Sequence, residues 1–121
     1  ILVPVWANKN PAPLSRLEYV YDLIPELKGF SKRRGQQLSG GQQKLVALGR
    51  ALMIGTNLLL LDEPFEGVAP ALAQRLAEVI SQLKAEGMSV LFSESDLQYS
   101  EKLVQNIFVI DRGILSHKKS S

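Results

Sequence analysis

The sequence contains no cysteine, which excludes disulfide bonds, thiolate metal sites and a cysteine nucleophile. Long apolar segments are missing too, because the run Leu58–Leu61 is far shorter than the ~20 residues of a membrane-spanning helix. The formal net charge of +2 is too small to indicate a nucleic-acid partner. The chain opens with Ile1–Val5, without an initiating methionine and without the basic start of a signal peptide, so we expect a cut inside a larger protein.

The composition that remains is that of a globular protein. Hydrophobic residues make up 45% and charged residues 21% of 121 residues, which is typical of one folded domain with a real core. Two interpretations stay open for the local basic cluster, a solvated loop or a contact with an anionic partner. This cluster consists of Lys28, Lys32, Arg33 and Arg34.

Apolar residues recur at helical spacing through the first half of the chain. The pattern predicts an amphipathic helix that ends near Pro25, and a second helix over Ser39–Met53 in which the serine is the N-cap. Residues 1–13 contain three prolines and are expected to form an irregular lead-in, while residues 29–37 read as a polar loop. Residues 14–54 therefore form the helical part of the chain.

Strand and helix patterns alternate through residues 55–115. The expected elements are strands at Leu58–Leu61, Met88–Phe92 and Ile107–Ile110, a helix from Pro70 to a cap at Gly87, a short helix from Asp96 through Val104, and a turn at 111–113 into Ile114–Leu115. This order predicts an α/β fold with a mostly parallel sheet, flanking helices and a C-terminal antiparallel hairpin. Leu58–Leu61 is expected to be buried on both faces, and residues 116–121 to form a tail in which His117 is solvated.

Ser39, Gly40, Gly41 and Gln42 stand where the second helix begins. Two glycines at a helix start bring bare backbone N–H groups close to a ligand, and the helix dipole favours an anion such as phosphate. The Ser39 hydroxyl adds one more donor. An ordinary capped helix with a flexible entry is the alternative interpretation.

Asp62 and Glu63 follow the apolar strand Leu58–Leu61 directly. The carboxyl ends of parallel strands are the usual ligand edge of an open α/β sheet. An aspartate there can hold Mg²⁺, and a neighbouring glutamate can polarise a water for attack on a phosphoryl group. Taken alone, the pair would equally fit a strand that ends in a solvated acidic turn.

Together the two motifs, separated by one helix and a turn, closely resemble the ATP-binding cassette (ABC) ATPase family. The matching segments are Leu38–Gln42, Gly49–Leu52 and Leu58–Pro64. The resemblance extends from about Leu14 to Leu115 and covers the C-terminal half of such a domain. It implies the fold of that half of a P-loop-type nucleotide-binding domain, with ATP and Mg²⁺ as the cofactors of the complete domain.

The resemblance also assigns roles to individual residues. Ser39–Gln42 match the family signature, which contacts the γ-phosphate of an ATP molecule bound by the opposite subunit. Asp62 matches the aspartate associated with Mg²⁺, and Glu63 matches the catalytic base. Ser95 falls at the position of the family's switch histidine, and Ala69 replaces the aspartate that usually precedes Pro70.

The phosphate-binding loop G-x-x-x-x-G-K-[ST] occurs nowhere in the sequence. Without its lysine and hydroxyl, ATP loses most of its binding donors, so we expect this chain to be inactive by itself. A parallel sheet cut in half also exposes a strand edge, so we expect the chain to self-associate.

The stretch Asp62–Pro70 resembles the ATPase subunits of branched-chain amino-acid and urea importers. That subgroup implies solute import, membrane subunits and a second ATP-binding subunit as partners, no nucleic acid, and a cytoplasmic place at the inner or plasma membrane held through a partner. The alternative is a truncated, catalytically silent interaction module that self-associates or binds a transporter. Non-transport ABC proteins are disfavoured, because coiled-coil heptads and a strongly basic surface are absent.

Overall fold

The computed structural model describes residues 13–55 and 57–120, so the lead-in expected over residues 1–12 lies outside the described residues. Along the chain the elements are α2 (Pro13–Leu23), α3 (Glu26–Phe30), η1 (Gly35–Gln37), α4 (Gly40–Ile54), β1 (Leu58–Asp62), α5 (Pro70–Ala85), β2 (Ser89–Ser93), η2 (Glu101–Leu103), β3 (Asn106–Asp111) and β4 (Ile114–Lys119). Helices α2, α4 and α5 and all the strands lie where the sequence predicts them, within a few residues.

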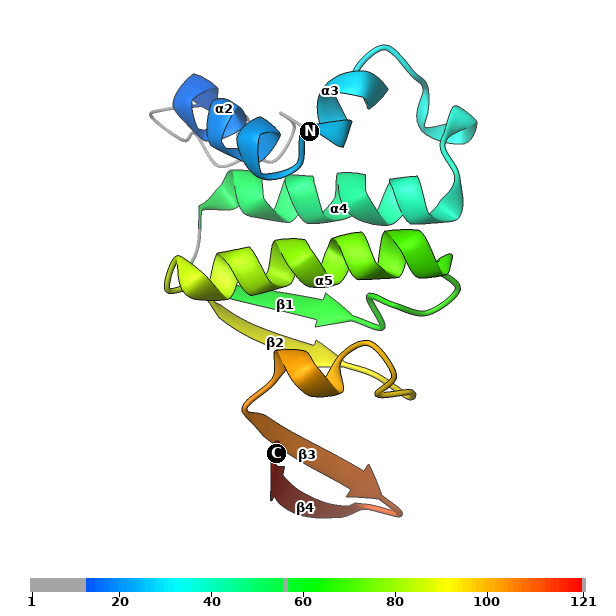
Figure 1. Cartoon of the computed structure of the whole chain (residues 1–121), viewed down its shortest axis with the longest axis vertical. Helices are drawn as coiled ribbons and strands as arrows, with labels where there is room; N and C mark the ends of the chain where they lie inside the picture. The colour runs from blue at the N-terminus through cyan, green and yellow to red at the C-terminus, as the bar shows by residue number, and fades with distance from the viewer. Residues whose placement is uncertain (1–12, 56, 121) are drawn as a thin grey trace.

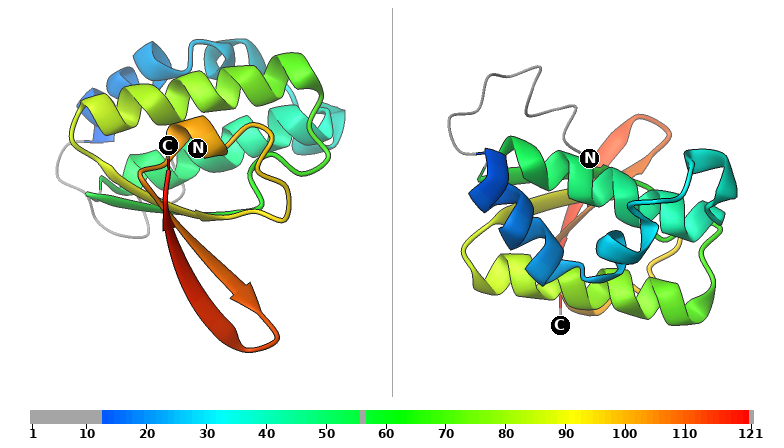
Figure 2. Two further views of the ribbon diagram at one scale, coloured as in Figure 1. Left: turned by 60° about the horizontal axis from the view of Figure 1, so that its bottom comes forward. Right: turned by 90° about the horizontal axis from the view of Figure 1, so that it is seen from above.

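The helices form layers beside the parallel strands. Helices α4 and α5 run in the same direction, opposite to β1, while α2 and α3 lie on the side away from the sheet (Figures 1 and 2). The apolar stripes of these helices meet in one core. Its fully buried large side chains include Val20, Ile24, Leu45, Leu52, Met53, Leu76, Val79, Ile80 and Leu83.

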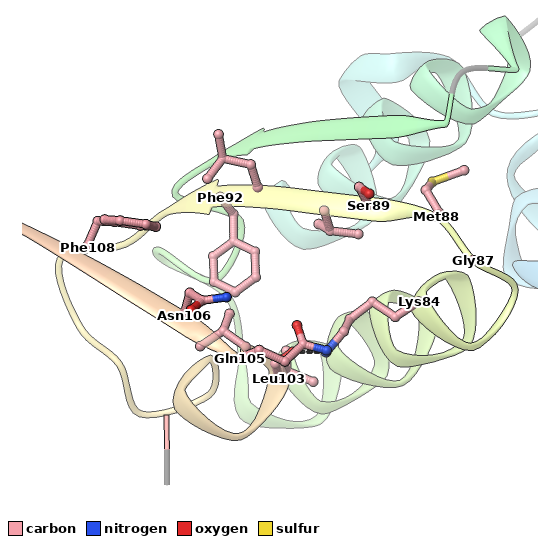
Figure 3. A pocket seen from close by; sticks show the side chains of 12 residues that line it. Lys84, Gly87, Met88, Ser89, Phe92, Leu103, Gln105, Asn106 and Phe108 are labelled. Atoms are coloured by element: carbon pink, nitrogen blue, oxygen red, sulfur yellow. Dashed lines mark hydrogen bonds between the residues drawn. The ribbon is translucent and has the colours of Figure 1, made fainter. Parts of the chain in front are cut away.

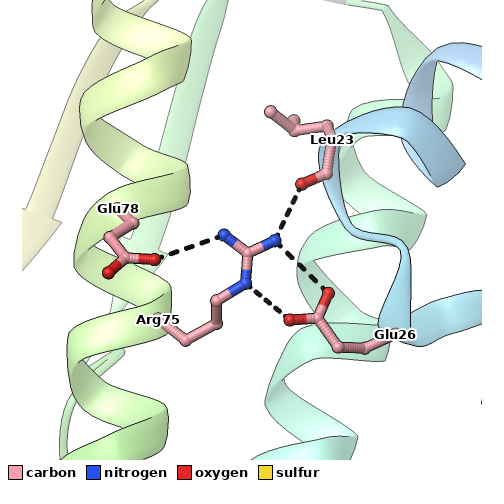
Figure 4. Close-up of polar contacts among 4 residues, drawn as sticks. All are labelled: Leu23, Glu26, Arg75 and Glu78. Carbon is pink, nitrogen blue, oxygen red and sulfur yellow. Dashed lines mark hydrogen bonds and ion pairs between the residues drawn. The ribbon is translucent and has the colours of Figure 1, made fainter.

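Arg75 joins α5 to the turn between α2 and α3 (Figure 4). Its Nε atom donates to Glu26 Oε1 at 2.5 Å, and one of its terminal nitrogens donates to the Leu23 carbonyl oxygen at 3.1 Å. The hydrogen bond from Arg75 lowers the pKa of the Glu26 carboxyl. The guanidinium therefore satisfies both a charge and a helix-end carbonyl at once.

The strands form two separate pairs. Strands β1 and β2 are parallel, in register from Leu58 opposite Ser89 to Asp62 opposite Ser93. Strands β3 and β4 are antiparallel and project away from the helices as a hairpin. The α/β class, the parallel strands and the antiparallel end are confirmed, but in the described residues they are not joined into one sheet.

The prediction that Leu58–Leu61 is buried on both faces is wrong. Leu59 is buried, whereas Leu58 is 50% and Leu60 is 65% exposed. On the paired strand, Leu91 is 59% exposed on the same face. The reason is that, within the described residues, the helices cover only one face of this pair.

Three local expectations also need correction. The short helix predicted from Asp96 through Val104 is reduced to a turn and η2, although Asp96 Oδ1 accepts the Gln98 N–H as a helix cap would. The polar loop over residues 29–37 contains the 3₁₀ turn η1 and the end of α3. Strand β4 includes residues 116–119 of the predicted tail, so exposed His117 pairs with Asn106 at 3.0 Å and stacks on Phe108.

Candidate active site

Asp62 and Glu63 lie at the carboxyl edge of the parallel strand pair β1–β2, as predicted. The Ser93 hydroxyl, at the end of β2, donates to Asp62 Oδ1 at 2.6 Å. The Glu63 N–H donates to the Ser93 carbonyl oxygen at 3.1 Å, which extends the ladder by one residue. The neighbouring strand therefore fixes both the side chain of Asp62 and the backbone of Glu63.

Glu63 adopts a left-handed backbone conformation with φ of +44°, which is unusual for a residue other than glycine. This turn directs its carboxylate toward Ser95, whose hydroxyl donates at 2.6 Å and whose N–H donates at 3.2 Å. The hydrogen bonds from Ser95 lower the pKa of the Glu63 carboxyl, against the opposing charge of Asp62. Glu63 is therefore an anionic hydrogen-bond acceptor at neutral pH.

Glu94 supports the turn from the next loop. Its Oε1 atom accepts the Phe65 N–H at 2.9 Å, and the buried Phe65 ring packs at 6.3 Å from the Phe92 centroid and 5.9 Å from that of Tyr99. Burial raises the pKa of the Glu94 carboxyl, and the nearby Glu63 charge adds to the rise. Two adjacent glutamates thus have pKa values shifted in opposite directions, an arrangement found at functional sites.

Lys44 is a site residue that the sequence reasoning missed. From α4 its Nζ atom donates to three carbonyl oxygens of the turn after β1, those of Glu63 at 2.8 Å, Pro64 at 3.3 Å and Glu66 at 2.6 Å. The sequence carried a signal for it, because Lys44 lies one helical turn before the buried Leu48 and so on the inward side of the helix.

The glycine motif begins α4 with a reciprocal cap. The Ser39 hydroxyl oxygen accepts the Gln42 N–H at 3.2 Å, and Gln42 Oε1 accepts the Ser39 N–H at 3.0 Å. The backbone N–H groups of Gly40 and Gly41 have no hydrogen-bond partner within the described chain. The Ser39 hydroxyl keeps its own hydrogen for donation to a ligand.

The two glycines of the motif differ in their surroundings. A Cβ atom on Gly41 would lie 2.1 Å from Leu72 Cδ2, so Leu72 would have to shift for α4 to keep its approach to α5. A Cβ atom on Gly40 would meet nothing within 4 Å. Gly41 therefore serves helix packing, while Gly40 leaves a stretch of backbone open at the start of the helix.

The structure places the motif and the acidic edge at the same end of the molecule, where α4 and α5 begin and β1 ends (Figure 1). Across residues 13–55 and 57–120 no hydrogen bond joins Ser39–Gln42 to the carboxylates of Asp62 or Glu63. Lys44 connects the two, because it belongs to α4, which the motif begins, and its Nζ atom donates to the Glu63 carbonyl oxygen.

A magnesium ion fits the acidic edge only if waters and phosphate oxygens supply most of its ligands. The described residues hold no group of three or more histidine or acidic side chains close enough to bind a metal by themselves. Asp62 is exposed and offers a carboxylate, and Mg²⁺ in phosphate sites typically takes one or two carboxylates together with waters and phosphate oxygens. Asp62 would hold Mg²⁺ in this way.

Comparison with known proteins shows the family to which the chain is similar. The model of the ABC transporter family matches residues 14–66. The chain is 40% identical over 98 residues to the high-affinity branched-chain amino acid transport ATP-binding protein BraG of Pseudomonas aeruginosa, covering 81% of this chain and 42% of that protein. It is 36% identical over 108 residues to the probable branched-chain amino acid transport ATP-binding protein LivG of Methanocaldococcus jannaschii, covering 89% of this chain and 42% of that protein.

Solved structures give the same result. The ADP conformation of MJ1267, an ATP-binding cassette of an ABC transporter, matches with a TM-score of 0.77 and 31% identity over 87% of this chain and 41% of that one. A nucleotide-free ATP-binding cassette from an ABC transporter matches with a TM-score of 0.83 and 29% identity, over 96% of this chain and 46% of that one. The chain thus spans less than half the length of the relatives it matches, and it belongs to the ABC ATPase family.

Proposed function

We propose that this chain supplies the C-terminal half of an ABC transporter ATP-binding subunit, which binds and hydrolyses ATP to power solute import. The observation that carries the proposal is the acidic edge, where anionic Glu63 is held by Ser95 next to Asp62. Similarity to BraG and LivG favours branched-chain amino acids as the solute, and the Asp62–Pro70 stretch leaves urea as the other candidate.

In this proposal Glu63 acts as the general base. Its carboxylate accepts hydrogen bonds at neutral pH and can orient a water for in-line attack on the γ-phosphate. Asp62 would hold Mg²⁺, which neutralises phosphate charge when bound. Ser95 stands at the switch position and sets the direction of the Glu63 carboxylate.

The signature residues Ser39–Gln42 act on an ATP molecule of a second subunit. The free N–H groups of Gly40 and Gly41, the positive end of α4 and the Ser39 hydroxyl form a donor set suited to phosphate oxygens. The absence of any bond from this set to Asp62 or Glu63 agrees with use of the two motifs in different ATP sites.

The partners in this proposal are a second ATP-binding subunit and the membrane subunits of a transporter. The described residues form no helix long and apolar enough to span a bilayer. Similarity to BraG and LivG supports the further proposal that the protein works at the cytoplasmic face of the inner or plasma membrane, held there by those subunits.

An ATPase assay tests the proposal. We define the complementing fragment as the part of BraG that this chain does not match, made as a separate polypeptide and expected to carry the phosphate-binding loop. We expect no turnover from this chain alone and Mg²⁺-dependent turnover from the mixture. Glu63→Gln should abolish turnover yet leave ATP binding. Glu86→Gln, at the C-terminal end of α5 and away from the acidic edge, should change neither. Turnover that survives Glu63→Gln would contradict the assigned base.

A silent interaction module is the second candidate. It is favoured by the apolar surface on strands β1 to β4, where Leu60 is 65%, Ile110 is 77% and Leu115 is 63% exposed. In that case the chain would associate with itself or with a transporter subunit and never complete an ATP site. If light scattering finds only monomers at high concentration, a module that acts by self-association is excluded.

A further inference from the structure

Lys44 is a half-buried cation whose partners are backbone carbonyls and not a carboxylate. Its ammonium group carries three donor hydrogens, and three carbonyl oxygens of the turn after β1 lie within hydrogen-bond distance of Nζ. Both ion pairs found among residues 13–55 and 57–120 belong to Arg75, so Lys44 has no acidic partner there. All three donors of this side chain therefore hold the backbone of that turn.

The turn that Lys44 holds is the one from which the Glu63 side chain extends. Both lone pairs of the Glu63 carbonyl oxygen are used, because it accepts Lys44 Nζ at 2.8 Å and the Glu66 N–H at 3.2 Å. The left-handed φ of Glu63, +44°, is a conformation that persists only where the surroundings impose it. The fixed carbonyl and the fixed φ together orient the Cα–Cβ bond, and so the direction from which the carboxylate reaches Ser95.

Helix α4 contacts the same segment a second time, in its first turn. A Cβ atom on Gly41 would meet Leu72 and would also lie 3.7 Å from Val68 Cγ1, so the helix backbone passes close to the residues that lead from the turn into α5. Gly41 and Lys44 are three residues apart and thus lie on one face of the helix. The first two turns of α4, directly after the signature serine, are therefore packed against the segment that follows the acidic edge.

We propose that Lys44 is a positioning residue for the general base, because it fastens the turn at Glu63 to helix α4. The assignment rests on the proposed function, in which Glu63 is the base. Lys44 acts through the turn and not on the nucleotide, since its three donors already have carbonyl partners. Ser95 holds the end of the Glu63 side chain, and Lys44 holds the backbone from which that side chain extends.

A lysine that only stabilises the fold would act differently. Lost stability lowers the fraction of folded chain and exposes amides throughout the core together, whereas a lost positioning contact releases one turn while the rest stays folded. The test therefore compares the turn with a distant reference in the same molecule, and Lys44→Met with a variant that weakens the fold elsewhere.

Amide hydrogen exchange of the whole 121-residue chain gives the first readout. The Ser95 N–H donates to Glu63 Oε2 at 3.2 Å, so its exchange rate reports whether the carboxylate is in place. The Ser89 N–H is the internal reference, because it is hydrogen-bonded at the start of β2, remote from the site at the end of that strand (Figure 3). Lys44→Met should raise the ratio of the Ser95 rate to the Ser89 rate about tenfold.

Arg75→Met is the matched control for lost stability. Arg75 joins α5 to the turn between α2 and α3, and it makes no contact with the turn after β1 in the described part of the chain. This variant should leave the ratio of the two exchange rates within about twofold of the native value.

Turnover by the mixture with the complementing fragment gives the second readout. Lys44→Met should lower kcat at least about tenfold and leave KM for ATP within about threefold, because the lysine orients the base and is not a donor to phosphate. Lys44→Arg keeps a charged donor and should lie between the native chain and Lys44→Met in kcat and in Ser95 exchange. Arg75→Met should change neither kcat nor KM.

The outcomes are distinct. Equal acceleration of the Ser95 and Ser89 amides in Lys44→Met, an unchanged kcat, or an arginine variant no better than the methionine variant overturns the positioning role. If the native mixture shows no turnover while Lys44→Met still releases the Ser95 amide, the positioning role stands and the proposed function fails. If the native mixture hydrolyses ATP and Lys44→Met does so equally well, the proposed function stands and the positioning role fails.

Discussion

Replacement of Lys44 by methionine should destabilise the turn that carries Glu63. Methionine keeps the apolar stem of the lysine but leaves three carbonyl oxygens without their donor, at 2.6 to 3.3 Å from Nζ in the native chain. A hydrogen bond from a charged donor contributes about 1.5–3 kcal/mol. Water can replace the donor at the exposed Glu66 carbonyl, and the other two bonds share one cation, so we expect a loss of about 2 kcal/mol.

For a domain of this size, that loss corresponds to a decrease of about 8 °C in melting temperature. Thermal and urea unfolding followed by circular dichroism measures it directly. Lys32→Met is the matched control, because Lys32 is exposed and makes no hydrogen bond within the described chain. If Lys44→Met unfolds within about 2 °C of that control, the carbonyl contacts of Lys44 do not stabilise the turn.

Three further predictions concern positions away from this lysine. Gly41→Ala should destabilise the chain by about 1–3 kcal/mol through its clash with Leu72, whereas Gly40→Ala should not, and Leu72→Ala should reduce the effect of Gly41→Ala in a double-mutant cycle. Burial and a hydrogen bond to a glutamate raise the pKa of Tyr19 to about 12, so one of three tyrosines should ionise late in an absorbance titration. Stability present below about pH 10 should then be lost toward pH 12, and Tyr19→Phe should remove that step. Arg75→Met should cost about 1–2 kcal/mol in urea unfolding, and an unchanged midpoint would show that its contacts are replaced by water.

The sequence predicted the helices and strands well because they depend on local patterns. Helix α4 begins at the Ser39 cap and ends where Gly55 adopts a left-handed conformation, both visible in the residue types. The carboxyl-edge position of Asp62 followed from the same local logic. Asp96 accepts the Gln98 N–H as a helix cap would, yet only a turn and η2 follow, so a capping residue alone does not ensure a full helix.

The sequence alone does not predict which elements cover each surface. The apolar run Leu58–Leu61 is typical of a strand buried on both faces, yet Leu60 is exposed because the described helices cover only the other face of the strand pair. The contacts of Lys44 also depend on tertiary structure, since they join α4 to a turn far along the chain. The separation of the described strands into two pairs also depends on tertiary structure and not on local sequence.

We propose above that this chain supplies one half of an ATP site. Calorimetry with Mg²⁺-ATP, on this chain alone and then on its mixture with the complementing fragment, measures whether that site forms. We expect no measurable binding to the chain alone and stoichiometric binding to the mixture, weakened by Asp62→Asn. A mixture that associates but binds no ATP, or tight ATP binding by this chain alone, would contradict the proposal.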